Sequence, residues 1–288
     1  MTDNLSLSAV TTKFAEFLKN HKKASATILA YTNDIAQLDK FLTERGITTI
    51  TAIKLEHLEN FKETLASNGY TAKSISRKIN SIKTFFRFLK SEGLIETDPA
   101  ASVTHPKYEI KPPRILSRLE YRALRDACRG DVRISAIVEL MLQTGIRIGE
   151  VANLRLEDYK NSEIYIRPFE SHAERTIPLN KAAKEALDKY LKERPKVKEK
   201  AIFVTKTGRP FLIRNIRSSI ERYFDVAGIK DAKVNDLRHT WVYHHLAAGT
   251  PLITISKLAG HKRISTTEKY LKLIGEGKKE DSVRLDEL

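Results

Sequence analysis

Cysteine is almost missing from this chain of 288 residues, which has a single one, at position 128. One cysteine excludes an internal disulfide and a cysteine-built zinc site, and it favours a reducing, intracellular setting. We expect Cys128 to lie in the hydrophobic core. The chain also lacks a basic, apolar leader at its start, and no segment reaches the roughly 18 apolar residues that a membrane span needs. A cytoplasmic location is therefore predicted.

Two further absences concern phosphate chemistry. The sequence has no GxxxxGKS or GxxxxGKT loop, the usual cradle for the phosphates of a nucleotide. It also has no acidic cluster of the kind that holds two metal ions in many nucleases and polymerases. We therefore expect no cofactor. A phosphodiester reaction without one needs a protein nucleophile, fixed cations around the phosphate, and proton donors.

Positive charge is in excess, because 51 lysines and arginines stand against 36 aspartates and glutamates, a net charge of +15. A charge of this size points to a polyanionic partner, with DNA or RNA as the leading class. Most of the excess lies after residue 100, where 37 basic residues face 25 acidic ones. A basic surface that only keeps the protein soluble is the alternative interpretation.

The first domain, residues 1–104, is predicted to contain four amphipathic helices near 7–20, 25–45, 54–68 and 71–93. The last helix carries six basic residues and no acidic one between Thr71 and Lys90. Its apolar residues recur at helical spacing, so the cations are expected on the remaining surface, within reach of DNA phosphates. The expected DNA contacts are Lys73, Arg77, Lys78, Lys83 and Arg87. A solvated charged face is the alternative.

Residues 105–116 contain three prolines and little periodicity, which predicts an extended linker between two domains. The second domain is predicted over residues 117–275. Helices are expected near 117–129, 132–144, 147–154, 180–193, 213–226, 234–248, 251–258 and 264–273, and strands near 163–167, 175–179 and 201–204. This pattern is typical of a mainly α (α+β) fold with a small antiparallel sheet.

Three short segments of the second domain carry candidate chemistry in a defined order. Arg147 lies in TGIRIGEVANL, Arg238 in NDLRHTW, and both His261 and Tyr270 in LAGHKRISTTEKY. In this order and spacing they resemble the tyrosine recombinase or phage integrase family, in its Xer-like branch. The resemblance covers nearly the whole chain. It implies an N-terminal four-helix core-binding domain with a SAM-like fold, followed by a mostly helical catalytic domain.

The resemblance also implies a reaction, the cleavage and rejoining of DNA through a 3′-phosphotyrosyl intermediate without metal or ATP. Tyr270 would be the nucleophile. Arg147 and Arg238 would hold the non-bridging phosphate oxygens, since planar guanidinium groups match that geometry and stay charged. His261 would bind the phosphate or assist proton transfer.

Two neighbours of these residues are expected to support them. Glu150, three positions after Arg147 on the same helix face, would hold nearby groups in place, with a surface ion pair as the alternative. His239 directly follows Arg238 and is interpreted as a supporting or core histidine rather than a proton carrier. Trp241 is expected in the core.

The sequence departs from the family pattern at two positions. The family usually has a histidine three residues before the second arginine, where this chain has Asn235. An amide can hydrogen-bond a phosphate, so Asn235 stays a candidate site residue, but it cannot carry a proton at neutral pH. The family also uses a lysine between two strands as general acid, yet residues 161–180 contain no lysine. We hypothesise that His172 donates this proton instead, with a reference pKa of about 6.5. Arg175 is interpreted as a strand residue outside the site.

The resemblance implies double-stranded DNA as partner and self-assembly, from a monomer or weak oligomer to a tetramer on two DNA sites. Residues 276–288 are predicted to be a mixed-charge tail that docks on a neighbouring protomer, with a disordered terminus as the alternative. Two other functions stay open. One is a type IB-like topoisomerase that relaxes supercoils, and the other is a DNA-binding homologue with weakened catalysis. Chromosome segregation, integration and transposition all remain open as biological roles.

Overall fold

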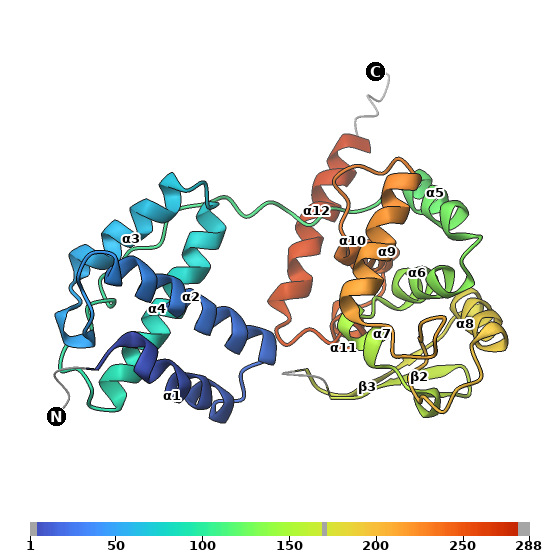
Figure 1. The fold of residues 1–288 in the computed structure, drawn as a ribbon. Helices are drawn as coiled ribbons and strands as arrows, with labels where there is room; N and C mark the ends of the chain where they lie inside the picture. The colour runs from blue at the N-terminus through green and yellow to red at the C-terminus, as the bar shows by residue number, and fades with distance from the viewer. Residues whose placement is uncertain (1–4, 169–171, 282–288) are drawn as a thin grey trace, which may run out of the picture. The chain divides into compact units, whose positions relative to one another are not determined.

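The computed structural model describes residues 5–168 and 172–281, with only the backbone for 276–281, and it divides into two compact units (Figure 1). The first unit ends at Ile110 and the second begins at Lys111, inside the proline-containing segment 105–116. Each unit has a hydrophobic core of its own, so the two are described separately. Within the described residues, no helix combines the length and the apolar character that crossing a membrane requires.

Four helices make up the first unit. They are α1 (Leu7–Asn20), α2 (Ser25–Thr43), α3 (Leu55–Ser67) and α4 (Ala72–Ser91), with a short 3₁₀ turn, η1 (Ile50–Ala52), before α3. Ser6 and Thr71 cap α1 and α4, because their hydroxyls accept hydrogen bonds from backbone N–H groups of the first turn. Phe14 of α1 packs edge-on against Phe85 of α4 with 5.1 Å between ring centroids. The predicted four-helix domain is confirmed.

A buried carboxylate ties α2 to α4. Asp34 of α2 is 2% exposed and accepts hydrogen bonds from Arg77, Lys78 and Ser81 of α4. Lys78 is 7% exposed, and its Nζ also donates to Gln37 at 2.6 Å. The expectation that Lys78 lies on the surface for DNA is therefore wrong, since its ammonium neutralises Asp34 inside the bundle. The side chain of Arg77 is 46% exposed and its guanidinium binds the same carboxylate, so DNA contact by Arg77 stays a prediction.

The second unit is mainly helical. Its helices are α5 (Arg118–Cys128), α6 (Val132–Thr144), α7 (Ile148–Asn153), α8 (Lys181–Glu193), α9 (Ile213–Val226), α10 (Val234–Ala247), α11 (Leu252–Ala259) and α12 (Ser265–Asp281). A 3₁₀ turn, η2 (Leu156–Asp158), precedes three strands, β1 (Tyr159–Lys160), β2 (Glu163–Ile166) and β3 (Arg175–Pro178). The strands form an antiparallel sheet in the order β1-β2-β3, with Ile164 opposite Ile177. The expected fold class is confirmed.

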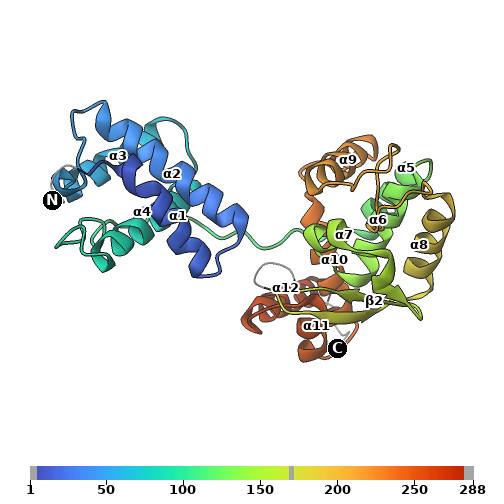
Figure 2. The ribbon, with the colours of Figure 1, turned by 60° about the horizontal axis from the view of Figure 1, so that its bottom comes forward.

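The core of this unit is built around α6, which packs against α5, α8, α9 and α10. Helix α6 is apolar on nearly every side, and Ile134, Ile137 and Leu140 are fully buried. Cys128 is also fully buried, as predicted. A smaller apolar cluster joins α10, α11 and α12, and it includes Trp241 and Tyr270. Figure 2 shows α11 and α12 side by side at one edge of the unit.

Two strand predictions need correction. Residues 201–204 form no regular strand, because Ala201 and Val204 make only isolated bridges. Strand β1 was not predicted, since it has only two residues. It pairs with β2 because Asn161 and Ser162 adopt left-handed backbone conformations, with φ of 51° and 63°, which reverse the chain between the strands.

The end of the second unit also differs from the prediction. Helix α12 continues to Asp281 instead of ending near residue 273, so Gly275 lies within the helix. The first six residues of the predicted tail therefore continue the backbone of α12. Residues 282–288 lie outside the described part of the chain, and docking of the tail on a neighbour stays a prediction.

Candidate active site

Three arginines from different parts of the second unit donate hydrogen bonds to the end of α11. The helix stops at Gly260, whose left-handed backbone (φ 65°) leaves the preceding carbonyl groups without helical partners. The contacts are Arg175 Nε to Leu258 O at 2.7 Å, Arg147 to Ala259 O and Gly260 O at 3.0 and 2.6 Å, and Arg238 to Ala259 O at 2.7 Å. Arg147 and Arg238 thus meet at one oxygen, at the negative end of a helix.

Two glycines allow this close approach. Gly145, in the turn between α6 and α7, has a φ of 62°, and its carbonyl accepts a hydrogen bond from Arg238. A Cβ on Gly145 would lie 2.3 Å from Cε3 of Trp241, and a Cβ on Gly260 would lie 2.8 Å from Nη1 of Arg175. Neither position has room for a side chain. The glycines of TGIR and LAGH are therefore part of how the arginines are positioned.

Glu150 of α7 is the anion among these cations. It is 3% exposed and accepts hydrogen bonds from the backbone N and from Nη1 of Arg147, both at 3.0 Å. Arg175 donates to both of its oxygens, at 2.9 and 2.7 Å. Burial opposes the negative charge, but the bonds and charges of Arg175 and Arg147 lower the pKa of Glu150 to about 2. Glu150 is thus an ionised, buried hub, not a surface ion pair.

Strand β3 brings Arg175 into the site. Its side chain is 9% exposed and faces inward, as does Ile177 two residues later at 2%. The interpretation of Arg175 as a strand residue outside the site is therefore wrong. The alternation of inward and outward residues in RTIP could have found it, because the sequence places Arg175 in register with a buried isoleucine.

Tyr270 lies on α12, which packs against α10 and α11. The residue is 4% exposed, and its hydroxyl lies 2.5 Å from Nδ1 of His239. Burial raises the pKa of Tyr270 to about 12, against the opposing effect of the Arg238 charge. Burial also lowers the pKa of Arg238 to about 9, which leaves the guanidinium charged at neutral pH. The phenol stays protonated at neutral pH, so attack on phosphorus requires a proton acceptor.

His239 joins Tyr270 to Asn235. Both α10 residues lie one turn apart, and Nδ2 of Asn235 is 2.8 Å from Nε2 of His239. Burial lowers the pKa of His239, so the ring is neutral at neutral pH. The sequence predicted a supporting histidine, but not its contact with the tyrosine. The spacing of four residues between Asn235 and His239 is the only sequence signal for their pairing.

His261 lies directly after Gly260, between α11 and α12. Its Nδ1 is 2.7 Å from the hydroxyl of Thr267, which is fully buried on α12. Burial, followed by the positive charges of Arg238 and Arg147, lowers the pKa of His261 to about 3. The imidazole is therefore neutral at neutral pH, and its pKa responds to Arg147, which also binds Glu150.

The site thus unites residues from α7, β3, α10, α12 and the end of α11. His172 is half-buried and follows residues 169–171, which lie outside the described part of the chain. Its role as an acid stays a prediction. Among residues 5–168 and 172–281, no three His, Cys, Asp or Glu side chains are grouped to hold a metal ion.

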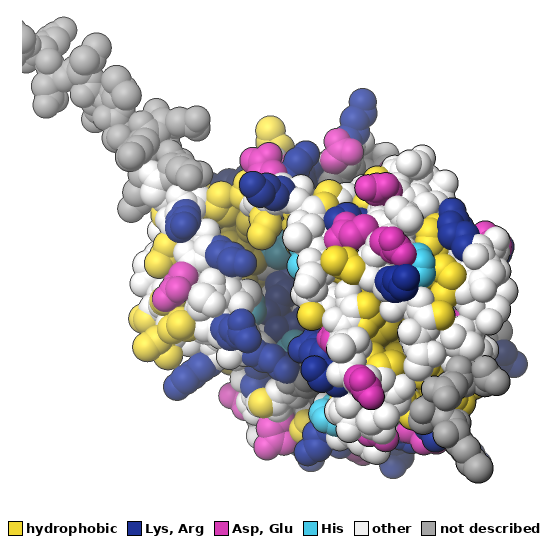
Figure 3. All heavy atoms as spheres, turned by 90° about the vertical axis from the view of Figure 1, so that its left-hand side faces the viewer, with side chains coloured by type: hydrophobic (Ala, Val, Ile, Leu, Met, Phe, Trp, Pro, Cys, Tyr) yellow, Lys and Arg dark blue, Asp and Glu magenta, His cyan; other side chains and the backbone are white. Residues whose placement is uncertain are grey.

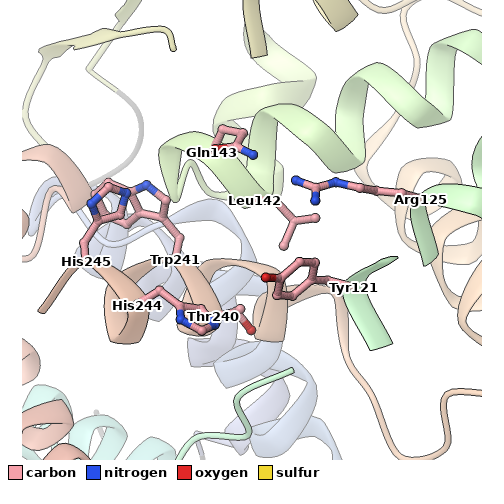
Figure 4. A pocket seen from close by; sticks show the side chains of 8 residues that line it. All are labelled: Tyr121, Arg125, Leu142, Gln143, Thr240, Trp241, His244 and His245. Carbon is pink, nitrogen blue, oxygen red and sulfur yellow. The ribbon is translucent and has the colours of Figure 1, made fainter. Parts of the chain in front are cut away.

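A separate cavity of about 220 Å³ lies between α5, α6 and α10 (Figure 4). Its lining residues are Tyr121, Arg125, Leu142, Gln143, Thr240, Trp241, His244 and His245. Nε1 of Trp241 and Nε2 of His244 are buried without a hydrogen-bond partner in the described structure. None of the predicted catalytic residues lines this cavity, so it is not the candidate active site. Trp241 is 5% exposed, as expected of a core residue.

The other predicted DNA contacts of α4 remain accessible. Lys73 and Arg87 are exposed and Lys83 is half-exposed, with its Nζ donating to the carbonyl of Ala101 at 3.1 Å. Figure 3 shows basic side chains exposed on the one face that it draws, with acidic ones between them. DNA binding by these three residues stays a prediction.

Reversing two of these charges, with Lys83→Glu and Arg87→Glu together, is expected to weaken binding to any DNA. It should also reduce the slope of log affinity against log salt by about one per lost phosphate contact. Fluorescence anisotropy over a salt series measures both quantities. Lys181→Glu with Lys189→Glu on the exposed face of α8 changes the net charge equally and is the matched control. Equal affinity and salt slope for the two double variants would contradict DNA contact by α4.

Family comparisons agree with this division of the chain. Residues 114–275 match the model of the phage integrase family, and residues 11–93 match the phage integrase N-terminal SAM-like domain. Tyrosine recombinase XerC of Oceanobacillus iheyensis is 31% identical over 274 residues, which cover 89% of this chain and 89% of the relative. XerC of Lactobacillus delbrueckii subsp. bulgaricus is 32% identical over 274 residues, covering 90% and 92%.

Solved structures agree at the level of the fold. The crystal structure of XerA recombinase is similar with a TM-score of 0.54 and 26% identity, over 97% of this chain and 100% of that one. A lambda integrase tetramer bound to a Holliday junction is similar with a TM-score of 0.77 and 18% identity, over 93% and 78%. With a catalytic-domain match over more than half its length and relatives above 30% identity along most of it, this chain belongs to the phage integrase family.

Proposed function

We propose that this chain is a site-specific DNA recombinase that cleaves and rejoins double-stranded DNA, with Tyr270 as nucleophile. Its relatives are named tyrosine recombinases, and they align with about nine-tenths of the chain. The observation that carries the proposal is the meeting of Arg147 and Arg238 at the carbonyl of Ala259, in the same cluster as the paired His239 and Tyr270. Two guanidinium groups that converge on one oxygen are suited to gripping a phosphate.

A bound phosphate would compete with the α11 carbonyls for these guanidinium groups. Carbonyl oxygens carry only partial charge, whereas a phosphodiester offers two oxygens that share a full negative charge, so exchange favours the phosphate. Negative charge increases on these oxygens in the five-coordinate transition state. One donor aimed at such charge can contribute roughly 3–4 kcal/mol to its stabilisation.

The proposed step is an exchange of phosphate esters. Tyr270 Oη forms a bond to phosphorus while the bond from phosphorus to the 5′-oxygen breaks. The products are a 3′-phosphotyrosyl link and a free 5′-hydroxyl. Because one ester replaces another, the bond energy is kept, and a 5′-hydroxyl from a partner strand can reverse the step without ATP.

His172 is the proposed donor of the proton that the departing 5′-oxygen takes up, because no lysine occurs in residues 161–180. Its reference pKa of about 6.5 permits donation near neutral pH. Replacing His172 by alanine should slow cleavage about 10²–10⁴-fold. A substrate with sulfur in place of the 5′-bridging oxygen should restore most of the rate, because a thiolate leaves without a proton. Cleavage of ordinary DNA at the wild-type rate would rule the role out.

Assembly on DNA is part of the proposal. A lambda integrase of the same fold is described as a tetramer bound to a Holliday junction, and another as a dimer bound to a core site. We expect this chain to act likewise, as four copies on two duplexes. A DNA substrate and the single cysteine both support a cytoplasmic location, which stays a prediction.

The decisive experiment traps the covalent intermediate. Selecting a random duplex pool for binding to the full chain gives the preferred site. A nick a few nucleotides to the 3′ side of the scissile phosphate then lets the short fragment with the free 5′-hydroxyl diffuse away after cleavage. A protein–DNA complex that survives denaturation is expected. Its absence on the selected site would favour a DNA-binding homologue instead. A plasmid with two selected sites should recombine, whereas site-independent relaxation of a supercoiled plasmid without recombination would indicate a topoisomerase.

A further inference from the structure

Asn235, His239 and Tyr270 are joined by hydrogen bonds in that order. This arrangement bears on which group removes the proton of the nucleophile. Tyr270 is 4% exposed and protonated at neutral pH, so bulk water has little access to its hydroxyl. Asn235, at the position where the family pattern has a histidine, cannot take up a proton. His239 has a ring nitrogen 2.5 Å from the phenol oxygen. It is the basic group in direct contact with the reacting atom.

Within the described residues, none of the other candidate bases of the site has a hydrogen bond to the hydroxyl of Tyr270. Nδ1 of His261 is hydrogen-bonded to Thr267 at 2.7 Å. Both oxygens of Glu150 are held by arginines. Oδ2 of Asp236 accepts the backbone N–H of Lys233 at 2.8 Å, at the start of α10. Among these groups, His239 is therefore the one whose nitrogen contacts the phenol oxygen of Tyr270.

We infer that His239 accepts the phenolic proton of Tyr270 during DNA cleavage and returns it on rejoining, and that Asn235 positions the ring and supports its change of protonation. This inference rests on the proposed function, because it concerns the nucleophile of that reaction. His239 touches the reacting atom and is a catalytic residue in this sense. Asn235 acts through His239 and is a positioning residue.

An amide is suited to this support. With its Nδ2 facing the ring, Asn235 donates to Nε2 of His239, and the ring proton resides on Nδ1 beside Tyr270. With the amide turned over, Oδ1 accepts from Nε2–H, and Nδ1 is free to take the proton of Tyr270. After transfer, the imidazolium carries Nε2–H, which Oδ1 continues to accept. Asn235 can therefore satisfy the ring in each protonation state.

The proton balance is simple. The proton moves from Tyr270 Oη to Nδ1 of His239 as the bond from oxygen to phosphorus forms, and the 5′-oxygen takes its proton separately at the other end of the breaking bond. The charged groups around His239 are Asp236 and Arg238 on α10, and their effects on its pKa oppose each other. The other titratable groups near His239 are Tyr270 on α12 and His261, which follows α11. Burial keeps the ring neutral before transfer.

His239→Asn tests proton acceptance directly, because asparagine can keep a hydrogen bond to Tyr270 but cannot take the proton. Single-turnover cleavage of the nicked substrate at pH 7 is expected to fall about 10²–10⁴-fold. The wild-type rate should level off at or below about pH 6.5, the reference pKa of histidine. The variant's rate should keep rising about tenfold per pH unit, because it depends on free phenolate. Wild-type rate and pH profile in His239→Asn would overturn the inference.

Fluorinated tyrosine at position 270 provides a second readout. Fluorine lowers the pKa of the phenol, so the defect of His239→Asn should shrink in proportion, whereas a purely structural defect should persist. Thermal unfolding and DNA binding of each variant verify that it is folded. If the defect is unchanged by fluorination, His239 does not act as the base.

Asn235→Ala tests the positioning role. Nitrogen-15 NMR of the histidine rings is expected to show a changed balance between the two tautomers of His239, because Nε2 loses its amide partner, and the plateau of the cleavage rate should fall. Asn235→Asp should raise the pKa of His239 and shift the acidic limb of the pH profile upward. An unchanged tautomer and unchanged profile in both variants would remove Asn235 from the mechanism. If the proposed function fails because Tyr270 is not the nucleophile, the result is different: the wild-type chain forms a covalent complex with DNA through another residue.

Discussion

Replacing Tyr270 by phenylalanine is expected to abolish the covalent complex with DNA, because the variant lacks the oxygen that forms the ester bond. DNA affinity should stay close to that of the wild-type chain. The ring is 4% exposed and retains its packing, so the fold loses only the hydrogen bond to His239, a net contribution of about 0.5–1.5 kcal/mol. Denaturing electrophoresis of the nicked suicide substrate measures the complex, and anisotropy measures binding.

Tyr223→Phe on α9 is the matched control, since it removes the hydroxyl of another partly buried tyrosine, which packs against the main core of the second unit and not in the cluster that contains Tyr270. It should form the covalent complex at the wild-type rate. A persistent complex in Tyr270→Phe, with peptide mapping to a different residue, would reassign the nucleophile. A complex in neither the wild-type nor the control chain would instead argue against cleavage itself.

Among the substitutions considered, Glu150→Gln is expected to destabilise the fold most. It should lower the free energy of unfolding of the second unit by about 3–5 kcal/mol. The carboxylate accepts four hydrogen bonds, two from Arg147 and two from Arg175, and its side chain is 1% exposed. A neutral amide leaves the buried guanidinium groups without their counter-ion. Chemical denaturation of the full chain, followed with a probe in each unit, measures the unfolding free energy of each unit separately and should show the loss in the second one.

The effect of this substitution should depend on pH in a defined direction. The pKa of Glu150 is lowered from 4.5 to about 2, so its carboxylate stabilises the folded state above about pH 4.5. This stabilisation is lost as pH falls from about 4.5 towards 2, and the difference between Glu150→Gln and the wild-type chain should shrink over the same window. Glu157→Gln is the control, because Glu157 is 46% exposed in its pairs with Arg155 and Arg167. A stability difference that is constant over this window would contradict the buried hub.

Much of the architecture was predictable because it depends on local pattern. The apolar spacing of residues 71–93 marks one face of α4, and Thr71 marks its start, so the helix follows from neighbours in sequence. The proline-containing segment 105–116 has no regular apolar spacing, which marked it as a linker. The short segments around Arg147, Arg238 and Tyr270 were also recognisable, because each candidate residue lies beside a turn or helix signal such as Gly145 or Gly260.

Partners across the fold were not predictable, because a residue's own helix does not reveal what lies opposite. Lys78 had the pattern of a surface cation on α4, but Asp34 comes from α2 and draws it inside. Arg175 was assigned away from the site because Glu150, its counter-ion, lies 25 positions earlier in the sequence.

The sequence by itself determined the two domains and most helices, since periodicity and capping act over a few residues, and it singled out the candidate residues of the site. Only the tertiary structure decided how those residues are connected. It brought His239 to the phenol of Tyr270, and it turned the end of α11 towards three arginines. The physical reason is that hydrogen bonds and ion pairs form between groups that packing brings within about 3 Å, and packing is set by the whole core.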